Sequence, residues 1–206
     1  MAELINIDID FKYAVNKAVE IFQSGGVFIY PTDTIYGFGC NPFNDSSMKT
    51  LNKIKGRSKE KKYILLISDI KSLFKYITLN DERVIVFLNK IWPNPISVVL
   101  NLNEKTKSLY KNDSAAFRIP DNEFCVSLLK KIKLPLVSTS VNRSNSLPLK
   151  EYSSIVKRFE KQVEAVFYSE KVRGGEESTL VDFRDNYPKI LRYGKINIIE
   201  LWEKLN

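Results

Sequence analysis

"VFIYPTDTIYGFGC" (residues 27–40) joins an apolar segment to a stretch rich in small hydroxyl residues and glycine. The four apolar residues Val27–Tyr30 are typical of a buried strand. Before them, apolar side chains recur at helical spacing from Phe11 to Phe22, which predicts a helix. Ligands of open α/β sheets bind beyond the carboxyl ends of strands, where loops offer backbone N–H groups and short polar side chains. Residues 31–43 are therefore predicted to form a loop that is the floor of a ligand site.

The composition indicates one domain over residues 1–206 and suits an anionic partner. A chain of 206 residues with 44% hydrophobic content supports one substantial core. Its 32 Lys and Arg against 24 Asp and Glu give a net charge of +8, which suits a nucleotide, a nucleic acid or an acidic metabolite. Cys40 and Cys125 lack the spacing of a zinc site or a disulfide framework. With no long apolar run and no signal-peptide pattern, we expect a cytoplasmic protein without a membrane segment.

The sequence contains no histidine. Histidine is the usual general base and the commonest metal ligand in proteins. Catalysis by this chain is therefore expected to depend on positioning and fixed charge, or on Lys, Tyr and carboxylates.

Hydrophobic periodicity predicts strands that alternate with helices and then follow one another closely. The helices are expected at residues 11–22, from Asp45 as the cap through Ile54, and at 81–91, 123–132 and 151–162; the strands at 27–30, 63–68, 96–102, 115–120, 134–140, 165–169, 178–183 and 189–193. This order favours an α/β domain with a mixed parallel and antiparallel sheet.

Polar groups cluster at the predicted strand ends. Six of the eight residues from Lys55 to Lys62 are charged, as in a solvated loop or an anion-binding one. Arg118 lies in the apolar strand "AAFRIP" and is either in a structural salt bridge or turned toward an anionic ligand. "STSVN" (138–142) is either a Ser/Thr turn or part of a polar pocket. Together these groups suggest a hydroxyl-lined, arginine-ringed cleft for a triphosphate and a small zwitterion.

Seven motifs in this order resemble those of the YrdC family: "PTDTIYGFGC", "KIKGR", "WPNPISVVL", "AAFRIP", "STSVN", "ESTLVDF" and "KILRYG", over about residues 11–194. The resemblance implies a twisted mixed sheet flanked by helices, with a concave basic groove. It also implies an L-threonylcarbamoyladenylate synthase, a nucleotidyltransferase that uses L-threonine, bicarbonate or CO2 and ATP and releases pyrophosphate. The product serves threonylcarbamoyladenosine modification of tRNA, so tRNA and tRNA-modifying proteins are possible partners.

The resemblance also assigns roles to individual residues. The catalytic KxR and SxN signature corresponds to Lys55, Arg57, Ser140 and Asn142. Threonine is expected to meet Thr34, Arg118, Ser138 and Ser178, and ATP to meet Arg57, Lys61, Ser114, Ser140 and Arg192. We expect no protein metal site, with Mg2+ carried mainly by the ATP phosphates.

The chain departs from the family pattern at four positions. Ser58, Lys62 and Thr139 stand where the family usually has proline, and Leu66 stands where some members carry a threonine-binding histidine. These departures concern the detail of the ligand contacts.

Two alternatives remain at this stage. One is a non-catalytic binder of double-stranded RNA or tRNA, although the sequence lacks a recognised RNA-binding signature. The other is a YciO-like paralogue, in which the two signatures are less well kept.

Overall fold

The segment that begins at Val27 forms a β-hairpin in the computed structural model. Strand β2 (Phe28–Tyr30) pairs antiparallel with β3 (Gly37–Gly39). The prediction that residues 31–43 are all loop is therefore wrong at β3. Gly39 cannot be replaced by a larger residue without a steric clash, because a Cβ there would lie 2.7 Å from the Tyr30 ring and 3.0 Å from the Phe28 ring.

The hairpin lies inside a mixed sheet. The structure describes residues 1–56, 62–79, 81–171, 175–185, 187–194, 196, 198 and 202. Within this part of the chain the sheet has ten strands, in the order β1-β8-β2-β3-β7-β4-β6-β5-β9-β10. The remaining strands are β1 (Glu3–Asn6), β4 (Ile64–Leu66), β5 (Ile96–Asn101), β6 (Ser114–Arg118), β7 (Leu136–Ser140), β8 (Ala165–Tyr168), β9 (Thr179–Asp182) and β10 (Lys189–Arg192).

Parallel and antiparallel pairs alternate irregularly across the sheet. Strand β8 pairs parallel with β1 and β2, and the pairs β4–β6 and β5–β9 are also parallel. The pairs β3–β7, β4–β7, β5–β6 and β9–β10 are antiparallel. The predicted mixed sheet is thus confirmed. Strand β1 was not predicted, because it is a four-residue strand at the edge of the sheet with Glu3 and Leu4 exposed.

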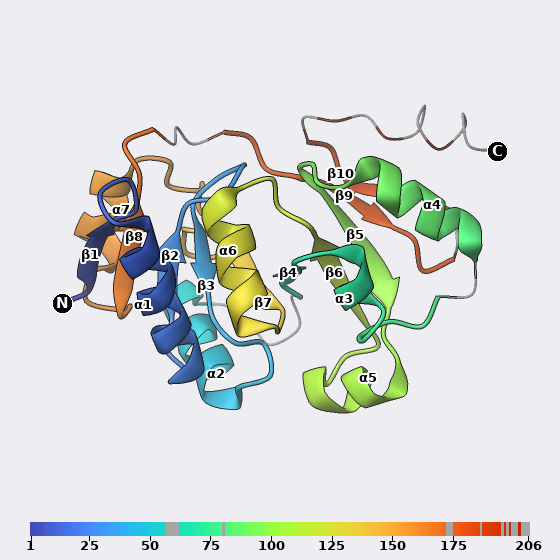
Figure 1. Ribbon diagram of the computed structural model, residues 1–206, viewed down its shortest axis with the longest axis horizontal. Coiled ribbons are helices and arrows are strands. Elements are labelled where there is room, and N and C mark those ends of the chain that lie inside the picture. Colours follow the sequence, from blue (N-terminus) through green and yellow to red (C-terminus); the bar gives the residue numbers. More distant parts are fainter. Residues whose placement is uncertain are drawn as a thin grey trace.

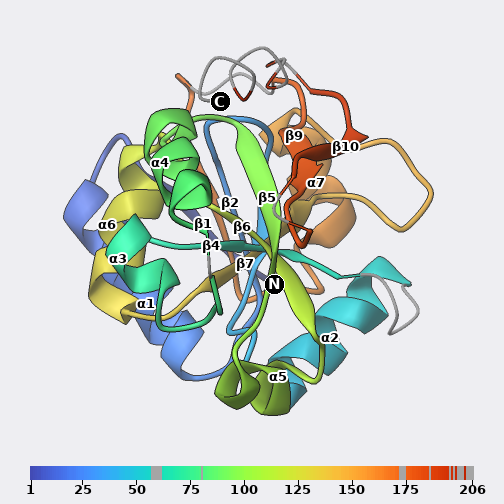
Figure 2. The ribbon, with the colours of Figure 1, turned by 90° about the vertical axis from the view of Figure 1, so that its right-hand side faces the viewer.

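Helices flank the sheet (Figure 1). They are α1 (Phe11–Gln23), α2 (Asp45–Lys55), α3 (Ile70–Leu73), α4 (Glu82–Ile91), α5 (Glu104–Tyr110), α6 (Glu123–Ile132) and α7 (Tyr152–Phe159). Figure 2 shows α1, α3 and α6 on one side of the sheet and α2 and α7 on the other. The buried apolar residues form two clusters: Ala14 and Ala18 of α1 pack in one, and Leu51 of α2, Leu73 of α3 and Phe159 of α7 in the other. This arrangement confirms the predicted α/β class.

The helix boundaries follow local capping interactions. Helix α2 begins one residue earlier than the sequence suggested, because the Asn44 side chain accepts a hydrogen bond from the Ser47 amide at 2.9 Å. The predicted cap, Asp45, is instead the first helical residue. Helices α3 and α5 were not predicted, since four and seven residues are too short for a periodic pattern.

Within the described residues, none of the helices is long and apolar enough to span a membrane.

Candidate functional site

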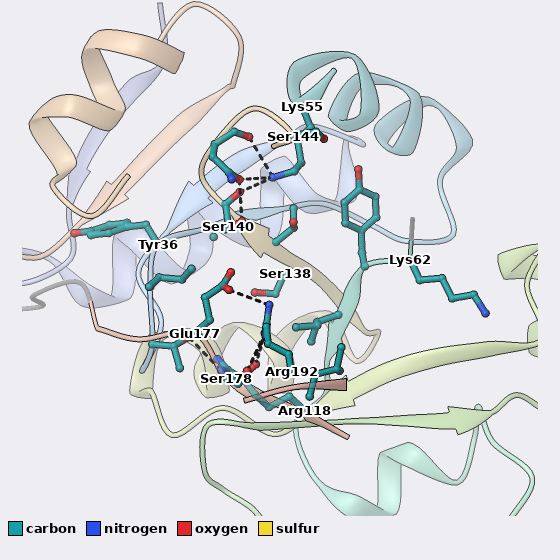
Figure 3. A pocket seen from close by; sticks show the side chains of 18 of the residues that line it. Tyr36, Lys55, Lys62, Arg118, Ser138, Ser140, Ser144, Glu177, Ser178 and Arg192 are labelled. Carbon is teal, nitrogen blue, oxygen red and sulfur yellow. Dashed lines mark hydrogen bonds and ion pairs between the residues drawn. The ribbon is translucent and has the colours of Figure 1, made fainter. Parts of the chain in front are cut away.

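A cavity of about 290 Å³ opens where β3, β4, β6 and β7 meet the carboxyl end of α2 and the β9–β10 pair. In Figure 3, Lys55 and Ser140 lie on one side of it, Arg118, Ser178 and Arg192 on the other, and Ser138 between them. The described residues that line it are Thr34–Gly37, Lys55, Lys62–Ile64, Arg118, Ser138–Ser140, Asn142, Ser144, Asn145, Glu177, Ser178, Leu180 and Arg192.

Lys55 connects α2 to the segment after β7. Its buried ammonium group donates hydrogen bonds to the Ser140 carbonyl at 2.6 Å and to Asn142 Oδ1 at 2.8 Å, and it lies 3.2 Å from the Asn142 carbonyl. Gly56 ends α2 in the left-handed conformation (φ 59°), which glycine adopts without a steric penalty. Lys55 therefore fixes one wall of the cavity.

The same wall is closed by hydrogen bonds between Ser140 and Asn142. The Ser140 hydroxyl donates to Asn142 Oδ1 at 2.8 Å, and the side-chain amide nitrogen of Asn142 donates to the Ser146 carbonyl. The Ser144 amide donates to the Lys55 carbonyl at 2.8 Å. Residues 140–146 are thus held against the end of α2.

Arg118 and Thr34 form the floor of the cavity. The Arg118 side chain is 3% exposed and pairs with Asp33, with 2.8 Å between Nη2 and Oδ1. Its Nη1 donates to the Thr34 hydroxyl at 3.2 Å. Arg118 Nε and Asp33 Oδ2 are buried and have no hydrogen-bond partner among the described residues. The sequence left open whether Arg118 is in a structural salt bridge or turned toward a ligand. In the structure its guanidinium is salt-bridged to Asp33 and also lines the cavity.

Ser178 and Arg192 form the opposite wall. Arg192 donates to the Ser178 carbonyl at 2.9 and 3.1 Å and to its hydroxyl at 3.1 Å. The Ser178 hydroxyl lies 2.9 Å from that of Ser97, and Glu177 lies 3.2 Å from Arg192 Nη1. These contacts hold Arg192 of β10 against Ser178, which directly precedes β9, at the rim of the cavity.

Comparison with known proteins gives the family. The model of the Sua5/YciO/YrdC family, described as "Telomere recombination", matches residues 20–194. This chain belongs to the Sua5/YciO/YrdC family. The fold resembles that of P. abyssi Sua5 complexed with L-threonine (TM-score 0.87, 24% identity), covering 100% of this chain and 60% of the other. The chain thus spans less than two thirds of the length of that Sua5.

Two further structures share the fold. E. coli YciO has a TM-score of 0.86 and 25% identity, with 97% of this chain and 98% of YciO covered. Full-length HypF in a phosphate- and nucleotide-bound form has a TM-score of 0.73 and 18% identity, with 87% of this chain and 29% of HypF covered. The family fold is therefore found both as a whole protein and as part of longer chains.

Most of the residues expected from the YrdC resemblance lie on this one cavity: Thr34, Lys55, Arg118, Ser138, Ser140, Asn142, Ser178 and Arg192. Ser114 is not among the lining residues. It lies four residues before Arg118 on β6, about 13 Å along the strand, and its hydroxyl accepts a hydrogen bond from Lys62 at 2.7 Å. Arg57 and Lys61 lie outside the described residues.

Sequence reasoning missed several polar groups of this Sua5/YciO/YrdC site. Asp33 and Glu177 lie inside two of the motifs, but no role was predicted for them, and Lys62 was predicted only to be a departure from the family pattern. A signal for Asp33 existed, because a buried arginine needs a counter-charge. Ser97, whose hydroxyl lies 2.9 Å from that of Ser178, was also missed. The sequence contains no signal for it, since a serine in a strand is common.

The cavity is electropositive. Its described lining includes Lys55, Lys62, Arg118 and Arg192 against one carboxylate, Glu177. Among the described residues no group of three or more Cys, Asp or Glu side chains is placed to hold a metal ion. Behind the floor, burial raises the pKa of Tyr30 well above its usual value, so the hydroxyl that donates to the Val137 carbonyl stays protonated. Such a site favours an anionic ligand with hydroxyl or carboxylate groups.

Proposed function

We propose that this protein is an L-threonylcarbamoyladenylate synthase, which uses L-threonine, bicarbonate or CO2 and ATP and serves threonylcarbamoyladenosine modification of tRNA. The observation that carries the proposal is the cluster of Lys55, Ser140 and Asn142 on the same cavity as Thr34 and Arg118. These are signature and threonine positions of the family, and the contacting pairs Lys55–Ser140 and Thr34–Arg118 are 85 and 84 residues apart in the chain. The L-threonine complex of P. abyssi Sua5 supports threonine as a ligand.

The reaction requires no protein nucleophile. The threonine amine adds to CO2 and loses a proton to give a carbamate. A carbamate oxygen then attacks the α-phosphorus of ATP, the bond from that phosphorus to the bridging oxygen breaks, and pyrophosphate leaves. Bringing two anions together is the main difficulty, and fixed positive charges and alignment reduce it. A site without histidine can supply both.

The floor suits the amino acid. Arg118 would hold the threonine carboxylate, since a guanidinium matches a carboxylate in geometry and charge. Thr34, Ser138 and Ser178 would contact the rest of the molecule. Asp33 holds Arg118 in place, with 2.8 Å between the charged groups.

The rim suits the nucleotide. Arg192 and Ser140 line the cavity and are proposed phosphate ligands, together with Arg57, Lys61 and Ser114 from the family pattern. Lys55 has a different role in this proposal. Because its ammonium group already donates to two oxygens of residues 140 and 142 at 2.6 and 2.8 Å, it positions Ser140 and Asn142.

A magnesium ion fits the site as a companion of ATP. Mg2+ prefers oxygen ligands and usually binds through substrate phosphates with one or two carboxylates. Glu177 offers the carboxylate of the described lining and lies 3.2 Å from Arg192. When bound, the ion would neutralise part of the phosphate charge.

The test is ATP-dependent pyrophosphate release, with threonine and bicarbonate each omitted in turn. Release that requires both supports the proposal. Release that is independent of threonine would contradict it. RNA binding that weakens with salt and ignores both ATP and threonine, without pyrophosphate release, would indicate the RNA-binding alternative.

A further inference from the structure

The hydrogen bonds of Thr32, behind the cavity floor, fix the direction of its proton. Its buried hydroxyl oxygen lies 2.7 Å from the Ile35 carbonyl, which can only accept. The same oxygen lies 3.0 Å from the Thr34 amide, which can only donate. Thr32 therefore donates to Ile35 and accepts from Thr34.

This assignment determines the proton of the Thr34 hydroxyl. The two threonine hydroxyls lie 2.9 Å apart, and the Thr32 proton is already used. Thr34 must then be the donor in this pair. Its oxygen also accepts a hydrogen bond from Arg118 at 3.2 Å. Toward the cavity, Thr34 can therefore only accept one further hydrogen bond.

We infer that Thr32 is a positioning residue that sets the side-chain specificity of the site. By turning the Thr34 proton away from the cavity, it makes Thr34 an acceptor for a ligand hydroxyl. The inference rests on the proposed function. The ligand class is an α-amino acid with a hydroxyl donor on its β-carbon.

The reaction geometry favours the hydroxyl as the donor that meets Thr34. The amine must face the nucleotide because its carbamate attacks the α-phosphate. The carboxylate cannot donate, and Arg118 provides its complement. The β-hydroxyl is the donor that remains for the floor. An analogue without it would leave the acceptor of Thr34 unpaired.

Calorimetry on the unmodified protein tests the donor requirement directly. The probes are threonine, 2-aminobutyrate, which lacks the hydroxyl, and 2-amino-3-fluorobutyrate, whose fluorine is of similar size and cannot donate. Threonine is expected to bind at least about tenfold more tightly than both analogues. Fluoro-analogue binding equal to that of threonine would overturn the inference.

Two variants test the role of Thr32. Thr32→Ser retains the hydroxyl and is expected to keep the preference for threonine over 2-aminobutyrate. Thr32→Val frees the Thr34 proton and is expected to lose most of that preference, while the affinity for ATP stays within about twofold. An unchanged preference in a folded Thr32→Val variant would refute the inference. If that variant does not fold, the fluoro-analogue result decides.

The outcomes for the inference and for the proposed function are distinct. A parent protein that binds threonine but ignores the hydroxyl contradicts the role of Thr32 alone. A parent protein that neither binds threonine nor releases pyrophosphate with it contradicts the proposed function as well.

Discussion

Replacing Lys55 with methionine tests whether this lysine holds the cavity wall together. The substitution keeps most of the side-chain volume but removes the donors to Ser140 and Asn142 at 2.6 and 2.8 Å. Hydrogen bonds from charged groups contribute about 1.5–3 kcal/mol each, and the gain from no longer burying a charge offsets part of their loss. We expect a net loss of about 3–5 kcal/mol in the free energy of unfolding.

Thermal unfolding of the ligand-free protein measures this loss. For a chain of this size, 1 kcal/mol corresponds to about 2–4 °C, so Tm should fall by roughly 6–20 °C. Lys53→Met is the matched control, because Lys53 lies in the same last turn of α2 and is exposed. Its Tm should change by less than about 2 °C. Threonine-dependent pyrophosphate release should fall in Lys55→Met and stay unchanged in the control.

The result that would refute this reasoning is a Tm of Lys55→Met equal to that of Lys53→Met. Lys55 would then make no net contribution to the ligand-free fold. A loss of activity without a loss of stability would instead support direct contact between Lys55 and a phosphate.

Three further outcomes are expected. Arg118→Ala should leave Asp33 buried without its partner, lower stability by about 3–5 kcal/mol and raise KM for threonine more than for ATP; unchanged unfolding would contradict the ion pair. Burial raises the pKa values of the Cys40 and Cys125 thiols, so iodoacetamide at pH 8 should label them only after unfolding, and labelling of the native protein would contradict this. A hydrogen bond from Arg184 lowers the pKa of Asp182. The Asp182 carboxylate therefore stabilises the fold above about pH 4, and this stabilisation is lost as the pH falls through the lowered pKa. Asp182→Asn should flatten that acid loss in pH-dependent denaturation, and parallel losses in parent and variant would contradict it.

The sequence by itself predicted most of the regular structure. Apolar periodicity placed α1, α4 and α6 close to their observed bounds, because each helix buries one apolar stripe. The same pattern located β2 and β5, whose residues are nearly all buried. These features follow from local composition and spacing. The resemblance to the YrdC family, carried by the motifs, named eight of the residues that line the cavity.

Pairings between distant segments were not available from the sequence. The Lys55 ammonium reaches Ser140 because β7 lies between β3 and β4, an order that chain position does not give. Arg118 had two possible roles until the fold brought Asp33 to 2.8 Å.

The direction of the Thr32 hydroxyl proton could not be predicted from the sequence. The sequence shows two threonines in "PTDT" but not which one donates. The conformation of the loop decides this, because it places the Ile35 carbonyl, three residues further along the chain, 2.7 Å from Thr32, where it takes the single proton of that hydroxyl. Local patterns thus determined which segments are buried, because burial depends on the polarity of each side chain. The partners of Lys55 and Arg118 lie about 85 residues away in the chain and depend on how distant strands are packed, so only the tertiary structure determined them.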